Sequence, residues 1–230
     1  MSEQTRMPAG RPSKGERTRA RILAAAAELF AASGFHAVSL RDIAAHAGLT
    51  HAGLLHHFPG KDSLLIEVLD HRDREDAEVL SQVAPREHPE EFLRGVVRVV
   101  HRNMRTPGPV GLYARISTEA ADPDHPAHAY FVRRYELLRA GLTEAFTALA
   151  ARTGAPPGHD PALTAQTLVA VMDGLQTQWL LAPAAIDMHA AVVAFFARIG
   201  LDFRDVPPLP DRRSGSEPSS ASTTSAEADT

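Results

Sequence analysis

The chain has 230 residues and a formal net charge of −4, with 44% hydrophobic and 23% charged residues. These values are typical of a folded globular protein and exclude wholesale disorder. The absence of cysteine excludes disulfides, thiolate metal ligands, iron–sulfur clusters and cysteine nucleophiles.

Charge is unevenly distributed along the chain. Residues 1–61 contain eight Lys or Arg and four Asp or Glu. The remainder of the chain contains 16 Lys or Arg and 24 Asp or Glu. A basic first quarter favours an anionic partner, with nucleic acid as the leading candidate, although a solvated basic arm has the same composition. The N-terminus lacks the apolar core of a signal peptide, and the longest apolar run, Ala190–Ala197, is shorter than the roughly 18–20 residues that span a bilayer. We therefore expect a cytoplasmic protein with no membrane partner.

Hydrophobic periodicity is helical along almost the whole chain, and no convincing pair of strands flanks a turn. Residues 1–14 are rich in Pro, Gly and Arg and indicate a flexible basic arm. The spacing of apolar residues then predicts three short helices, at 16–33, 40–47 and 51–58. Gly34, Gly48 and Pro59-Gly60 are expected to end them.

A second group of helices occupies the rest of the chain. The pattern predicts six of them, at about 61–83, 89–104, 110–121, 126–152, 161–181 and 188–198. Residues 205–230 are rich in Pro, Ser and Thr and indicate a disordered tail. The prediction is an all-α protein of about nine helices, with a three-helix domain at 15–61 and a helical ligand-binding and dimerisation domain at 62–204.

The second and third helices have the features of a helix-turn-helix. Ser39 and Asp42 have capping-box spacing at the second helix, and Thr50 is placed to cap the third. Gly48 lies in the turn between them, where a steep helix crossing needs a small residue. Any small three-helix core could share this spacing, but the two caps and the adjacent basic arm favour the helix-turn-helix.

The stretch from Arg17 to Leu65 resembles the DNA-binding domain of the tetracycline-repressor (TetR) family of transcriptional regulators, without a gap. The motifs that carry the resemblance are Phe30…Gly34-Phe35, Ser39-Leu-Arg-Asp-Ile-Ala, Ala47-Gly48-Leu-Thr50 and His57-Phe58-Pro-x-Lys61. The resemblance implies that the third helix enters the major groove and that a homodimer binds a palindromic operator in double-stranded DNA. The DNA-facing residues that it implies are Arg41, Thr50, His51, Ala52, Gly53, His56, His57 and Lys61.

The chemistry of these residues suits DNA. Arg41 could contact guanine or clamp a phosphate, and Thr50 with the free N–H groups of its helix suits a backbone phosphate. The histidines could donate to base acceptors, and the Ala52 methyl could meet a thymine methyl. Lys61 is expected to clamp a phosphate. For each residue, the alternative is a solvated side chain with no DNA contact.

The third helix also departs from the family pattern. Leu55 stands where the family often has a tyrosine whose hydroxyl contacts phosphate, so either Leu55 packs inward or that contact is missing. The helix has no Arg or Lys and depends on histidines, which gain charge as pH falls. We therefore expect operator affinity to rise as pH falls through about 6.5.

Beyond residue 61 the chain resembles the family in helical architecture only. The resemblance implies a dimer interface on the last two helices, with candidates Leu163, Thr167, Ala170, Val171, Gly174, Val192, Phe195, Phe196 and Ile199. These residues could instead form intramolecular core. The family often encloses an effector pocket, and the candidate lining residues are Met104, Tyr113, Ile116, Phe131, Tyr135, Met172, Gln176 and Trp179. Such aromatic and Met residues are more often plain core; if they line a pocket, they favour a largely hydrophobic effector.

No other chemistry is predicted. The segment 122–128 contains two Asp and two His, which can ligate divalent ions, but its two prolines and a helix start explain it equally well. We therefore expect no metal and no cofactor. The chain lacks a nucleophile elbow, a P-loop, a dinucleotide-binding glycine pattern and an H-E-x-x-H motif, so no enzymatic activity is expected.

The leading functional hypothesis is a sequence-specific transcriptional regulator, a repressor that a small effector releases from its operator. One alternative is an all-α binding protein or enzyme whose basic helices are only structural. Salt-dependent binding to a palindromic duplex distinguishes the two. The other alternative is a constitutive DNA-binding regulator with a filled core, which an enclosed cavity would argue against.

Overall fold

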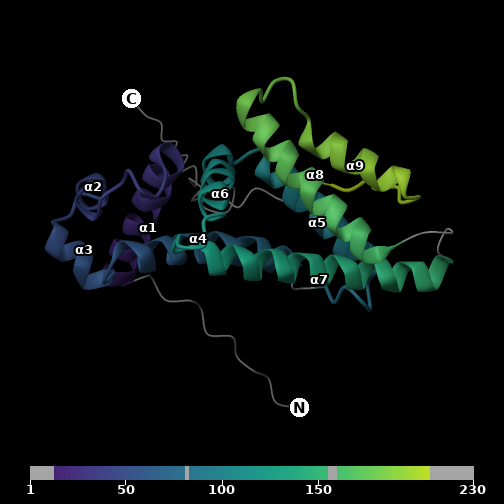
Figure 1. Ribbon diagram of the computed structural model, residues 1–230, viewed down its shortest axis with the longest axis horizontal. Helices are drawn as coiled ribbons and strands as arrows, with labels where there is room; N and C mark the ends of the chain where they lie inside the picture. The colour runs from purple at the N-terminus through teal and green to yellow at the C-terminus, as the bar shows by residue number, and fades with distance from the viewer. Residues whose placement is uncertain (1–12, 81–82, 155–159, 208–230) are drawn as a thin grey trace, which may run out of the picture.

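The computed structural model describes residues 13–80, 83–154 and 160–207. These ranges form nine α-helices and no strand, which confirms the all-α fold class. The helices are α1 (Lys14–Ser33), α2 (Leu40–His46), α3 (His51–His57), α4 (Lys61–Leu80), α5 (Pro89–Asn103), α6 (Pro107–Glu119), α7 (His128–Thr153), α8 (Pro161–Leu181) and α9 (Met188–Arg198). Figure 1 shows α2 and α3 at one end of an elongated molecule and α9 towards the other.

Side-chain caps determine where several helices begin. The expected caps are present, namely Ser39 with Asp42 at α2 and Thr50 at α3. Asp160 caps α8 and Asp187 caps α9 in the same way. The first helix begins at Lys14 rather than at 16, because Ser13 and Glu16 form a further capping box. The seventh begins at His128 rather than at 126, because the His125 N–H bonds to the Asp122 carbonyl and the His128 N–H to the His125 carbonyl. These two hydrogen bonds close tight turns that precede α7.

The first hydrophobic core lies beneath α1–α3 and extends into the next helices. Leu64 and Leu65 of α4 and Ile116 of α6 are fully buried in the same cluster as Phe30 and Leu54. The predicted domain boundary at residue 61 therefore does not separate two cores. Instead, α4 and α6 belong to both halves of the molecule.

The second core joins α5, α7, α8 and α9. Its fully buried members include Leu93, Ala145, Leu168 and Phe196. Val206 also packs into this core, so ordered packing continues beyond residue 204. Residues 1–12 of the predicted arm and residues 208–230 of the predicted tail lie outside the described residues. Among the described helices, none combines the length and apolar character that crossing a bilayer requires.

Candidate nucleic-acid interface and ligand cavity

Helix α3 turns one face into the core and the other to solvent. Leu54 is fully buried and fixes the rotation of the helix. Of the six predicted DNA-facing residues from Thr50 to His57, four are exposed and two, Gly53 and His57, are half-buried. The Thr50 hydroxyl accepts the Gly53 N–H at 3.1 Å, so the hydroxyl is already part of the helix start. The outward face of α3 is therefore available to a partner.

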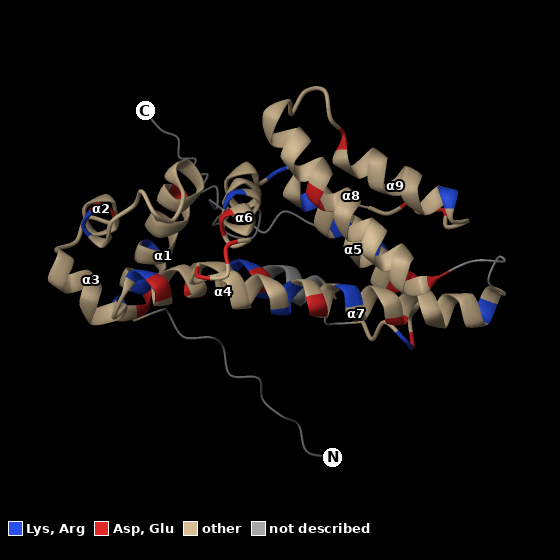
Figure 2. Cartoon of the chain, in the orientation of Figure 1, with Lys and Arg blue, Asp and Glu red and all other residues tan. Residues whose placement is uncertain are grey.

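The turn between α2 and α3 holds α3 in place. Gly48 adopts a φ of +65°, a conformation that L side chains rarely adopt. The Arg21 guanidinium of α1 donates to the Ala47 carbonyl, which ties the turn to α1. Arg41 is exposed in the first turn of α2. Figure 2 shows α3 without any Lys, Arg, Asp or Glu, so any cationic charge on this helix comes from histidines.

Lys61 has a different place from the one expected. Its Nζ donates to the carbonyls of Phe35 and Val38, both at 2.9 Å, and lies 4.2 Å from the centroid of the Phe35 ring. These carbonyls belong to the segment between α1 and α2, where they have no helical partner. The ammonium group of Lys61 therefore has a structural role in holding this segment, and its contact with a phosphate stays a prediction.

Leu55 points outward. The sequence left open whether this side chain packs into the core, and the structure shows that it does not. Its side chain is 39% exposed on α3 and carries no hydroxyl group. The phosphate contact that the family makes with tyrosine at this position is missing here.

A cavity of about 1360 Å³ lies among α4, α5, α6, α7 and α8. Its volume exceeds that of most small-ligand pockets, which range from about 300 to 1,000 Å³. The apolar part of its wall includes Phe92, Val96, Val100, Leu138, Leu142 and Val169. The cavity could therefore hold an organic molecule with a large apolar surface.

Five of the eight predicted lining residues border this cavity: Tyr113, Phe131, Tyr135, Met172 and Gln176. The other three do not, which corrects their predicted position. Ile116 is fully buried in the first core, Trp179 is buried in the second, and Met104 packs against the second. Helical periodicity identified the helices around the cavity but did not determine which face of each helix lines it.

Sequence reasoning missed the charged groups in the wall of the cavity. Asp73 of α4 accepts the Nε–H of Arg134 at 3.0 Å and a hydrogen bond from the Tyr130 hydroxyl. The Arg72 guanidinium lies 3.8 Å from the centroid of the Tyr113 ring. Asp73 and Arg134 are 61 residues apart, so no local pattern could have paired them.

A second polar group lies within the cavity. The Tyr135 hydroxyl donates to Oδ2 of Asp173 at 2.8 Å. Burial raises the pKa of Asp173, and the hydrogen bond from Tyr135 and the charge of Arg134 partly offset this effect. Burial and the neighbouring carboxylate raise the pKa of Tyr135 to about 12, so its hydroxyl stays protonated at neutral pH. This pair could orient a polar group of a ligand.

Comparison with known proteins decides the family. A family model described as "Bacterial regulatory proteins, tetR family" matches residues 22–68, and one described as "BetI-type transcriptional repressor, C-terminal" matches residues 117–200. Together these matches span more than half of the chain. The chain belongs to the TetR family.

Several relatives of this TetR-family chain are described as repressors. It is 38% identical over 110 residues to the HTH-type transcriptional repressor Rv3405c of Mycobacterium tuberculosis, over 48% of this chain and 56% of that protein. The chain thus matches about half the length of this curated relative.

Solved structures share the fold. NalD, the secondary repressor of the MexAB-OprM multidrug efflux pump in Pseudomonas aeruginosa, has 23% identity and a TM-score of 0.65, over 81% of this chain and 95% of that chain. The SmeT–triclosan complex has 18% identity and a TM-score of 0.67, over 85% of this chain and 100% of that chain. At these identities the likeness establishes the fold alone.

In the TetR-family chain described here, α8 exposes a stripe of small and apolar residues. The stripe consists of Leu163, Thr167, Ala170, Gly174 and Leu181, spaced three, four or seven residues apart. Leu163 is 59% exposed and Leu181 82%. A large apolar side chain this exposed in a monomer is a candidate for contact with a partner.

Helix α9 contributes less than predicted. Val192 and Phe196 are fully buried within the chain, so they are intramolecular core and not interface residues. Val171, Phe195 and Ile199 are half-buried. The interface prediction is thus corrected for two residues, while the exposed residues of α8 remain candidates.

Proposed function

We propose that this chain is a DNA-binding transcriptional repressor that binds a palindromic operator as a homodimer. We further propose that a small, largely hydrophobic effector in the cavity releases it from DNA. The similarity to curated repressors supports the first part, and the cavity supports the second.

The exposed face of α3 is the observation that carries the proposal. Buried Leu54 anchors the helix, and His51, Ala52 and His56 are exposed, as is Arg41 in the first turn of α2. Imidazole, guanidinium and methyl groups can read base edges in the major groove. Gly53 has no side chain, so the first turn of α3 leaves room for the DNA backbone to approach.

A dimer is required on physical grounds. One seven-residue helix reaches only a few base pairs, and two copies about 34–36 Å apart would read successive major grooves. The exposed stripe of α8 supplies a surface that two copies could bury against each other. This stripe lies at a distance from α3, so dimerisation leaves the DNA-reading face open (Figure 1).

The cavity is partly open to solvent and not enclosed, but its volume favours an effector-responsive regulator over one with a filled core. Helices α4 and α6 each pack in the first core on one face and line the cavity on another. An effector lowers DNA affinity only if it binds better to a conformation in which the two α3 helices no longer match the operator. A shift of α4 and α6 around a bound ligand is the direct route between the two sites.

Selection from random duplexes tests the proposed function. The full chain should enrich one palindromic sequence, and Arg41→Ala and His51→Ala should each weaken binding to it by at least about fivefold, since a good base contact contributes about 1–3 kcal/mol. His71→Ala is the matched control, because His71 is an exposed histidine of α4 away from α3. Failure to enrich any sequence, or equal binding by all variants, would contradict the proposal.

A further inference from the structure

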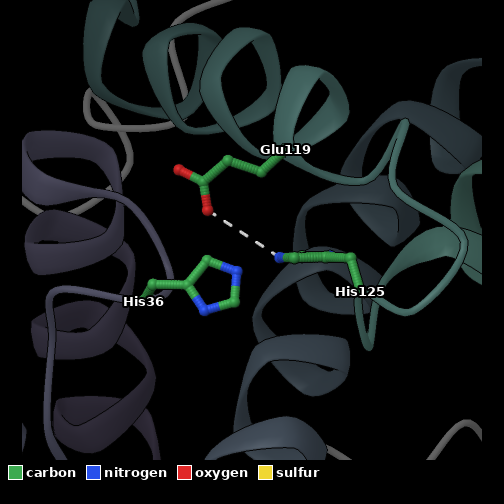
Figure 3. Close-up of side chains that lie close together, drawn as sticks. All are labelled: His36, Glu119 and His125. Atoms are coloured by element: carbon green, nitrogen blue, oxygen red, sulfur yellow. Dashed lines mark ion pairs between the residues drawn. The ribbon is translucent and has the colours of Figure 1, made fainter.

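Three metal-ligating side chains meet outside the DNA-reading face and the cavity. They are His36 in the turn after α1, Glu119 at the end of α6 and His125 in the loop before α7. One ligand atom from each lies within 4.8 Å of the other two. Figure 3 shows the three side chains converging on one space from segments that are distant in the sequence.

The environment of His125 points to a ligand. Its side chain is only 1% exposed, and among the described residues its Nε2 is the buried side-chain atom that lacks a hydrogen-bond partner. Nε2 faces Oε2 of Glu119 at 3.8 Å, which is too long for a hydrogen bond. Since a buried polar atom without a partner is costly, an occupant of this space would remove the cost.

Glu119 is held in place by the turn that carries His36. Its Oε2 accepts the N–H of Phe35 at 2.9 Å. A Cβ added at Gly34 would lie 2.2 Å from Oε1, so the carboxylate occupies space that only glycine leaves free. Such outer hydrogen bonds orient carboxylate ligands in metal sites.

The donor set suits a divalent transition metal ion. Two imidazole nitrogens and one carboxylate oxygen are ligands that Zn²⁺ accepts, with water completing the tetrahedron. His36 is exposed, which gives an ion and its water access from solvent. We propose that His36, Glu119 and His125 form a binding site for a divalent transition metal ion such as Zn²⁺.

Binding requires two local rearrangements. Ligand atoms around Zn²⁺ lie about 3.3 Å apart, closer than the 4.8 Å limit of this cluster, and exposed His36 is the side chain free to close in. The Ala127 N–H donates to Nδ1 of His125 at 3.1 Å. Ligation through Nε2 moves the ring proton to Nδ1, so this hydrogen bond is lost when the ion binds.

Calorimetric titration of the chelator-treated, untagged full chain with ZnCl₂ tests the site. One ion should bind per chain, and His36→Ala should weaken the affinity at least tenfold. Glu119→Gln should do the same while keeping an oxygen that can accept the Phe35 N–H. Because His36 is exposed, its variant should fold normally, which circular dichroism can check.

His189→Ala provides the matched control. The rings of His101 and His189 lie 5.1 Å apart and form a competing pair of imidazoles. The control variant should bind Zn²⁺ with unchanged affinity. In a second measurement, Co²⁺ bound to the wild-type chain should give the intense visible absorption bands of a tetrahedral site, and His36→Ala should abolish these bands. Absence of Zn²⁺ binding to the wild-type chain, or unchanged affinity in both site variants, would overturn the proposal. Neither readout depends on DNA binding, so the metal site and the repressor function can fail separately.

Discussion

Gly34 combines a backbone requirement with a contact between distant segments. Its φ of +81° disfavours any L side chain, and a Cβ there would also meet the Glu119 carboxylate at 2.2 Å. We expect Gly34→Ala to lower the free energy of unfolding by about 3 kcal/mol, from the strain of a positive-φ conformation that essentially only glycine adopts, about 1–3 kcal/mol, plus displacement of Glu119. Urea denaturation measures this change.

Gly154 separates the two causes. It has a φ of +77°, but a Cβ there would meet no atom of the described residues within 4 Å. Gly154→Ala should therefore cost only the strain, about 1 kcal/mol. Equal losses in the two variants would show that the contact with Glu119 adds nothing.

Lys61 is predicted to contribute to stability through its two carbonyl partners. Lys61→Met keeps the aliphatic stem but removes both hydrogen bonds, and we expect a loss of about 2 kcal/mol, because hydrogen bonds to charged groups contribute about 1.5–3 kcal/mol. Exposed Arg41→Ala is the control, with an expected change within about 0.5 kcal/mol. A Lys61→Met variant as stable as the wild-type chain would contradict the structural role of the ammonium group.

Because the carboxyl group of Asp173 is buried, we expect the free energy of unfolding to depend on pH. Because burial raises its folded-state pKa above the ordinary 3.8, the stability that its protonated form contributes is present at low pH and is lost as pH rises through the raised pKa. Asp173→Asn cannot ionise, and its amide oxygen can still accept the Tyr135 hydroxyl. The variant should gain stability relative to wild type between about pH 4 and pH 7 in urea denaturation. A difference that is constant across this range would contradict the buried-carboxylate account.

At the scale of the element, local signals predicted the helices well. Capping residues such as Ser39, Asp160 and Asp187 act within one turn of the chain, so their effect can be read from adjacent residues. The face that each helix buries depends on its neighbours instead. This is why Ile116 and Phe196, predicted for the pocket and the interface, lie in hydrophobic cores.

The exposed stripe of α8 gives a testable prediction about the homodimer. Leu163→Glu would place a charge at one end of the proposed dimer contact, and sedimentation equilibrium should show a shift from dimer towards monomer. Val132→Glu is the matched control, since Val132 is 45% exposed on α7, outside the stripe. If neither substitution changes the mass, the dimer contact lies elsewhere.

At the scale of the whole molecule, α4 and α6 connect the surface that would meet DNA with the cavity. The sequence did not predict that α6 packs against α1. The Glu119 contact with Phe35 spans 84 residues, and the polar network of Asp73 spans 61. Such pairs depend on how the helices come together, so no local pattern predicts them.

The spacing between the two halves of the operator tests the central claim most directly. If two α3 helices of a rigid dimer lie in successive major grooves, inserting about five base pairs between the half-sites puts them on opposite faces of the duplex. Fluorescence anisotropy with the selected palindrome should then show a loss of affinity of at least about tenfold, the weakening that losing one of two reading contacts implies. Unchanged affinity after the insertion would contradict paired binding by α3.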